Sequence, residues 1–143
     1  GPVATDVYGP ARTFVLFNAA GVSGFLLSNL MTGAPTIGAS GAVFGLLAAL
    51  IVYGRKRGSS LMTQQLWQWA VILFIFGFVM RGVNNWAHAG GFAGGWVSAQ
   101  LMGFIDERRE SSAVLITSLV LIGVTAVGVV LSFWKTSAIL LAE

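Results

Sequence analysis

Two residues of this sequence, Ser40 and His88, carry the side chains of a nucleophile and a general base. Ser40 lies in the stretch GASGAVFGL, residues 38–46, and His88, the single histidine, lies in NNWAHAGGFAGG, residues 84–95. A neutral imidazole within about 3 Å of a serine hydroxyl can take its proton as the serine attacks a carbonyl, and can return it to a leaving amine. The pair therefore predicts acyl-transfer chemistry, provided that the fold brings the two side chains together.

The composition indicates that lipid rather than water surrounds most of the chain. Hydrophobic residues make up 56% of it and charged residues only 9%, whereas a soluble domain carries roughly a quarter charged residues. The absence of cysteine excludes disulfides, thiol catalysis and zinc sites of the cysteine type. The net charge of +3 comes from a few basic residues in the loops, and it predicts no nucleic-acid partner.

Long apolar stretches predict an all-α polytopic membrane protein with about five transmembrane helices, forming a single membrane domain over residues 1–143. A helix of about 20 residues crosses a hydrocarbon core of roughly 30 Å. Backbone polar groups cannot stay unpaired in lipid, so apolar runs without strand alternation are read as helices. The third stretch is marginal in length unless it extends into residues 61–65. The predicted spans are residues 13–31, 36–53, 66–83, 86–105 and 113–134.

The basic residues predict the orientation of the chain in the cell (inner) membrane. If the N-terminus is cytoplasmic and the C-terminus lies on the outer side, most of the basic residues fall on the inner side, as the positive-inside rule requires. The inner residues are then Arg12, Arg55, Lys56, Arg57, Arg108 and Arg109, and the outer ones are Arg81 and Lys135.

With this orientation the second and fourth spans run parallel, from the outer face inward. Ser40 lies five residues beyond Pro35, and His88 three residues beyond Asn85. At a rise of about 1.5 Å per residue, the two side chains lie at a similar depth. Small residues at GxxxG spacing let helix backbones pack closely. The glycine pairs with this spacing are Gly41/Gly45, Gly90/Gly94 and Gly91/Gly95.

The chain offers no carboxylate to orient His88. Four of its acids fall on the predicted inner side and the fifth in the C-terminal tail, so a serine hydrolase built here is expected to be a dyad with His88 held by packing. Phe44, one turn beyond Ser40, offers a ring face for that packing. Backbone N–H groups around Ser40, in the segment from Gly38 to Gly41, are expected to meet the oxyanion at the start of a helix, where the helix dipole favours negative charge. The acids are Asp6, Asp106, Glu107, Glu110 and Glu143.

Each of these features also has a purely structural interpretation. A serine near a helix start is usually an N-cap or bonds a carbonyl one turn back. A histidine in a membrane helix can serve packing or headgroup contacts, although the cost of burying an ionisable group favours a functional role. The combination of equal depth, parallel helices and a glycine-lined contact favours the catalytic interpretation.

Both motifs resemble those of a known family. GASGAVFGL resembles the catalytic-serine motif of rhomboid intramembrane serine proteases, and NNWAHAGGFAGG resembles their histidine helix. YGPARTFVLFNAAGVSG, residues 8–24, is similar to the segment that leads into the helix before the serine helix. The resemblance extends over residues 8–105 and implies a rhomboid-like helical bundle. It further implies that Ser40 is the nucleophile and His88 the general base, supported by Gly38, Gly41, Phe44, Gly91 and Gly95.

The resemblance also implies what the protein acts on and what it needs. Transmembrane protein substrates would be cleaved near the outer membrane surface, within the lipid bilayer, without a metal or organic cofactor. The family core has six helices, and the two that precede this segment have no counterpart here. The second of them usually carries a histidine and an asparagine of the oxyanion hole, so we expect a fragment or a protein completed by another polypeptide.

Three functions therefore compete. An intramembrane serine protease, or its catalytic part, is favoured because both dyad residues stand in motif context. A non-catalytic rhomboid-like protein that binds transmembrane clients, or a structural subunit of a larger membrane complex, is favoured by the missing helices and small size. A channel or transporter subunit is the weakest interpretation, because intramembrane charges and half-helix repeats are absent.

Overall fold

The computed structural model describes residues 2–33, 38–80, 82–104 and 111–140. These residues form helices without any strand, which confirms the predicted all-α class. The helices are α1 (Pro2–Tyr8), α2 (Pro10–Thr32), α3 (Ser40–Lys56), α4 (Ser60–Val79), α5 (Asn85–Leu101) and α6 (Ser112–Leu140).

The helix bounds differ from the predicted apolar stretches in several places: α4 and α5 end about four residues early, at Val79 and Leu101, and α6 runs on to Leu140. α1 was not predicted, since seven residues are too few to show a periodic pattern. α3 begins only at Ser40. α4 spans Ser60–Val79 and therefore includes residues 61–65, the extension that the third predicted span needed to reach a sufficient length. Among the described helices, α2 and α4 are long and apolar enough to cross a membrane. The total of about five transmembrane helices stays a prediction.

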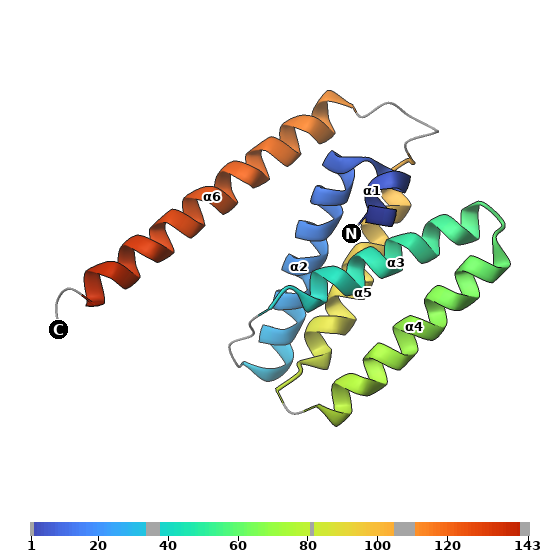
Figure 1. Cartoon of the computed structure of the whole chain (residues 1–143), viewed down its shortest axis with the longest axis horizontal. Coiled ribbons are helices and arrows are strands. Elements are labelled where there is room, and N and C mark those ends of the chain that lie inside the picture. Colours follow the sequence, from blue (N-terminus) through green and yellow to red (C-terminus); the bar gives the residue numbers. More distant parts are fainter. Residues whose placement is uncertain (1, 34–37, 81, 105–110, 141–143) are drawn as a thin grey trace.

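α5 occupies the centre of the bundle (Figure 1), where it packs against both α2 and α3. A β-carbon added to Gly24 of α2 would lie 2.7 Å from the carbonyl oxygen of Ala87, and one added to Gly90 of α5 would lie 2.6 Å from that of Ser23. Side chains larger than hydrogen therefore do not fit at either position, and the two helix backbones touch. Glycine at these positions is what allows α5 to lie so close to α2.

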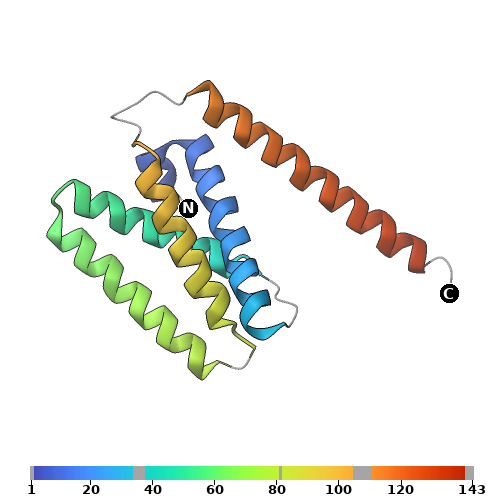
Figure 2. The same ribbon diagram turned by 180° about the vertical axis from the view of Figure 1, so that it is seen from behind.

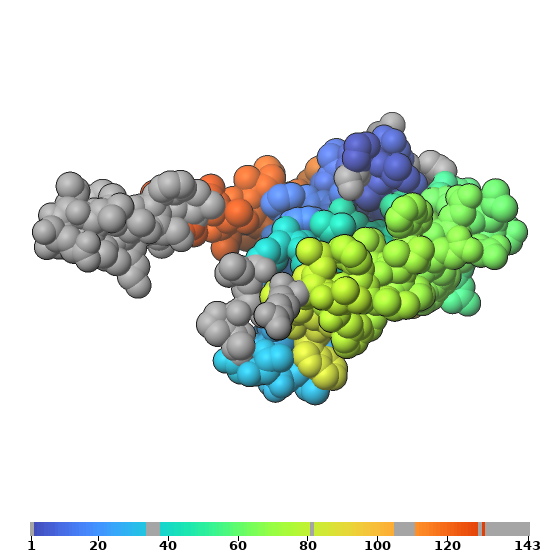
Figure 3. All heavy atoms as spheres, turned by 60° about the horizontal axis from the view of Figure 1, so that its bottom comes forward, coloured from blue at the N-terminus to red at the C-terminus, as the bar shows by residue number. Residues whose placement is uncertain are grey.

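The remaining helices lie around this centre. α4 packs along α3, and α6 extends away from the bundle in both ribbon views (Figures 1 and 2). In the described part of the chain, α6 contacts α2 and no other helix. The space-filling view shows the residues of α4 forming a broad outer surface (Figure 3). Only Ala70 and Gly77 of α4 are buried, so the helix exposes apolar side chains almost all round, as lipid-facing helices do.

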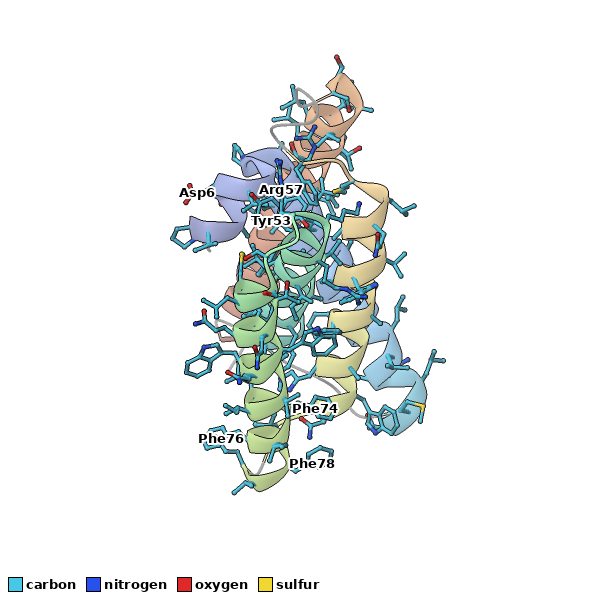
Figure 4. The ribbon with its side chains drawn as sticks, turned by 90° about the vertical axis from the view of Figure 1, so that its right-hand side faces the viewer. Asp6, Tyr53, Arg57, Phe74, Phe76 and Phe78 are labelled. Carbon is cyan, nitrogen blue, oxygen red and sulfur yellow. The ribbon has the colours of Figure 1, made fainter. Side chains whose placement is uncertain are left out.

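The end of the bundle that holds α1 has a compact aromatic core. The hydroxyl of Tyr8 donates a 2.7 Å hydrogen bond to the carbonyl oxygen of Ala49, and the rings of Tyr8 and Phe104 meet edge to face with centroids 5.3 Å apart. The basic residues at the end of α3 lie over aromatic rings here, Lys56 over Phe104 at 5.3 Å. Figure 4 shows Arg57 at this end, far from Phe74, Phe76 and Phe78 on α4. Basic residues and Ser40 thus lie at opposite ends of α3.

Candidate active site

Ser40 is the first residue of α3 and projects from its N-terminus. The N-cap is Ala39, and no side chain caps the helix. The interpretation of Ser40 as an N-cap is therefore wrong, and its side chain is exposed. Gly38 has a φ of 109°, a conformation that favours glycine, so the chain turns sharply just before the serine.

His88 lies in the first turn of α5, buried with 5% of its surface exposed. Asn84, the N-cap of α5, fixes where this helix begins: its Oδ1 accepts hydrogen bonds from the backbone N–H groups of Trp86 (3.1 Å) and Ala87 (3.2 Å). Its Nδ2 donates a 2.6 Å bond to the hydroxyl of Ser28 on α2. Our sequence analysis missed this role of Asn84, although an asparagine just before an apolar run is a typical N-cap signal.

The imidazole of His88 is stacked on the ring of Phe44. The two ring centroids lie 4.3 Å apart and the planes are inclined by 15°. Phe44 is itself buried, one turn after Ser40 on α3. The contact joins the two helices at the level of Ser40 and His88. Phe44 thus makes the predicted ring contact with His88. Its expected support of catalysis stays a prediction.

His88 has no acidic partner among the described residues. Its Nδ1 is buried and forms no hydrogen bond there. A carboxylate or carbonyl usually fixes the tautomer and orientation of a catalytic histidine. At this site, packing against Phe44 is the contact that orients the ring.

Glycines bring α3 and α5 into backbone contact beside these side chains. A β-carbon added to Gly91 would lie 2.8 Å from the Cα atom of Gly41, and one added to Gly41 would lie 2.8 Å from the carbonyl oxygen of Ala87. One helical turn further on, Gly95 is pressed against Gly45 in the same way. Because Ser40 precedes Gly41 and His88 follows Ala87, this contact sets the two side chains at one level.

Ser40 and His88 line the same pocket, which has a volume of about 810 Å³. Its other walls come from α4 and from the segment before α5. Within the described residues no hydrogen bond joins Ser40 to His88, and catalytic hydrogen bonds are often long or poorly aligned before substrate binds. Gly38 and Gly41 instead line a second hollow of about 320 Å³ between α2 and α3. The lining of the first pocket, here called the serine pocket, also includes Thr32, Phe44, Leu73, Phe76, Gly77, Asn84 and Asn85.

Comparisons with known proteins identify the family. The model of the Rhomboid domain matches residues 1–105. The Rhomboid protease GluP of Bacillus subtilis is 32% identical over 126 residues, which are 83% of this chain and 25% of that protein. RHOMBOID-like protein 1 of Arabidopsis thaliana is 32% identical over 112 residues, 68% of this chain and 25% of that protein. Rhomboid-like protease 5 of Toxoplasma gondii is 35% identical over 100 residues, 65% of this chain and 12% of that protein.

The chain is an integral membrane protein with a helical bundle, and it belongs to the rhomboid family. It spans a quarter or less of the length of these curated relatives. The match ends at residue 105, so α6 lies outside it.

Proposed function

We propose that this chain is the catalytic part of a rhomboid-type intramembrane serine protease, which cleaves transmembrane proteins near the outer membrane surface. The observation that carries the proposal is that Ser40 and the single histidine, His88, line one pocket at the starts of two helices in backbone contact. The relatives from Bacillus subtilis and Toxoplasma gondii are both named as proteases, which adds support.

The two side chains divide the reaction between them. As the Oγ atom of Ser40 bonds to the substrate carbonyl carbon, its proton passes to His88. The imidazolium then gives this proton to the leaving amine as the C–N bond breaks. A water molecule attacks the resulting acyl ester, His88 takes the proton of that water, and the serine leaves with a proton returned from the imidazolium. The peptide bond is thereby hydrolysed without a metal or organic cofactor.

The start of α3 is suited to the negative charge that develops in this reaction. The first backbone N–H groups of a helix have no partner within it, and the helix dipole favours an anion there. Ser40 is the first residue of α3, so an oxyanion formed at its Oγ-bound carbon lies beside these donors. Donors aimed at a developing oxyanion contribute about 3 kcal/mol each in a serine protease.

The charge distribution supports a direction for the membrane. Arg55 and Lys56 lie in the last turn of α3 and Arg57 caps it, at the end opposite Ser40. If that end is cytoplasmic, by the positive-inside rule, the serine pocket faces the outer side and its substrates are transmembrane proteins cut there. We include in the proposal that the two preceding core helices of the family, with further oxyanion donors, come from outside residues 1–143, either from the same polypeptide or from a second one.

Fluorophosphonate labelling of the purified protein in lipid nanodiscs tests the proposal, because the probe reacts covalently with an activated serine. We expect labelling that disappears in Ser40→Ala and falls strongly in His88→Ala. A Thr117→Ala variant is the control, since that hydroxyl lies on α6 and donates to the carbonyl oxygen of Ala113. Labelling that survives in Ser40→Ala contradicts the proposed nucleophile.

A second candidate function is a non-catalytic rhomboid-like protein that binds transmembrane clients or supports a larger complex. The observation that favours it is that the buried Nδ1 atom of His88 has no hydrogen-bond partner within the described residues, so no hydrogen bond fixes the tautomer that a general base needs. It predicts that a helical client peptide binds equally well to the parent protein and to Ser40→Ala, while neither is labelled nor cleaves the peptide. Labelling after co-expression with a segment that carries the two preceding helices favours the protease instead.

A further inference from the structure

Asn85 holds a buried polar atom that the catalytic roles above do not use. Its Oδ1 has no hydrogen-bond partner in the described part of the chain. The neighbouring Asn84 differs, because its side chain already caps α5 and bonds Ser28. A buried amide oxygen without a partner has lost the hydrogen bonds that it would make in water, so its presence calls for a ligand or a functional reason.

Asn85 lies beside the proposed site of reaction, with its amide oxygen against α4. Asn85 precedes His88 by three residues, so both lie on one face of α5, and both line the serine pocket. Across the pocket wall lies Gly77 of α4: a β-carbon added there would lie 3.1 Å from the Cγ atom of Asn85 and even closer to Oδ1. The absence of a side chain at Gly77 therefore leaves the room that the amide occupies.

A peptide in the serine pocket needs hydrogen-bond acceptors for its backbone N–H groups. Most described side chains that line the pocket are apolar, and several of the polar ones are engaged. The hydroxyl of Thr32 donates to the carbonyl oxygen of Ser28 at 2.8 Å, Asn84 Oδ1 caps α5, and Ser40 and His88 are needed for the reaction. Asn85 Oδ1 is the side-chain acceptor that remains.

We propose that Asn85 is a substrate-binding residue of the serine pocket, whose amide oxygen accepts a hydrogen bond from a backbone N–H group of the substrate. The inference rests on the proposed function and specifies how its substrate is held. Gly77 lies against the oxygen, on a helix whose other buried residue is Ala70. An entering peptide that displaces α4 at Gly77 would uncover Oδ1.

Binding measurements with amide-to-ester peptides test this role without requiring cleavage. The parent protein carries Ser40→Ala and is reconstituted in nanodiscs, and the probe is a fluorescent transmembrane peptide in which single backbone N–H groups are replaced by ester oxygens. We expect one ester position to weaken binding about fivefold, the value of one net hydrogen bond. In Asn85→Leu, which keeps the volume but removes the acceptor, amide and ester peptides should bind alike.

Two further variants separate binding from folding. Asn85→Asp keeps an oxygen at the same place and should retain the ester effect. Asn84→Ala should lower the unfolding temperature and still retain the ester effect, because its side chain caps a helix and binds no substrate. An Asn85→Leu protein that retains the full ester effect overturns the inference, and so does a parent protein that shows none at any position. Failure of fluorophosphonate labelling, by contrast, defeats the proposed protease while the binding measurements still decide the role of Asn85.

Discussion

Gly91 is the position at which a single methyl group should test the contact between α3 and α5. In Gly91→Ala the new Cβ atom lies 2.5 Å from the carbonyl carbon of Gly41 and closer still to its carbonyl oxygen, whereas carbon atoms pack at about 3.5–4.0 Å. The helices must therefore separate by about 1 Å. Overpacking of this kind costs about 1–3 kcal/mol, which exceeds the gain of up to about 1 kcal/mol from replacing a helical glycine by alanine.

The same separation should slow the reaction, because Ser40 lies on one of these helices and His88 on the other. A misplacement of about 1 Å can cost a factor of about 100 in rate. The assay combines two readouts in one preparation: the free energy of unfolding, from SDS titration in mixed micelles, and the initial rate of fluorophosphonate labelling. We expect Gly91→Ala to lower both, and Gly91→Val to lower them further.

Gly123→Ala provides the matched control for this experiment. Gly123 lies within α6, and no atom lies within 4 Å of a β-carbon added there. The variant should therefore show the gain in helix propensity alone, with an unchanged labelling rate. If Gly91→Ala is as stable as Gly123→Ala and is labelled at the parent rate, the backbone contact between α3 and α5 does not position the two side chains, and the reasoning is refuted.

Three further predictions concern the side chains around the pocket. Ser40→Ala and His88→Ala should each abolish cleavage of a transmembrane reporter while the protein stays folded by circular dichroism, and residual cleavage in either excludes the dyad. Phe44→Leu removes the aromatic stack on His88 while keeping the site apolar, so we expect labelling to slow about tenfold, less than the factor of about 100 or more that a general base contributes, because the base is misoriented and not removed; circular dichroism should stay the same. Asn84→Ala removes the N-cap of α5 and the bond to Ser28, which should cost about 1–2 kcal/mol of unfolding free energy in the SDS titration; a loss below 0.5 kcal/mol, about the lowest value for a cap, contradicts the assigned role.

The features that could be predicted are those that depend on residues close together in the sequence. The lengths of the apolar stretches predicted where the helices lie. The helix ends differ from the prediction by several residues where polar or glycine residues border an apolar run, as before Ser40 and around residues 61–65. The GxxxG pairs predicted a close approach of the second and fourth spans, which the contacts of Gly41 and Gly91 confirm. The common depth of Ser40 and His88 followed from counting residues, because a helix converts residue number into distance.

Other features depend on contacts between residues distant in the sequence, and no local pattern encodes them. The hydrogen bond from Asn84 to Ser28 joins residues 56 positions apart, and Asn85 at the start of α5 lies against Gly77 of α4. α1 is a helix of seven residues, shorter than an isolated helix can sustain, and it forms where Tyr8 reaches Ala49. Tertiary packing, which the sequence does not display, decides each of these cases.

In the proposed protease, packing also has to replace the third member of a catalytic triad. A carboxylate buried in lipid needs its own partners, and its desolvation is costly. Phe44 meets the same requirement, to hold the imidazole in one orientation, through a stacked ring contact of 4.3 Å that carries no charge. The stack depends on α3 and α5 lying close enough for the rings to touch, and glycine at positions 41 and 91 provides that distance. The small residues between the helices and the aromatic ring beside the histidine are therefore two parts of one arrangement, so that enlarging the glycines or shrinking the ring should impair the same proton transfer.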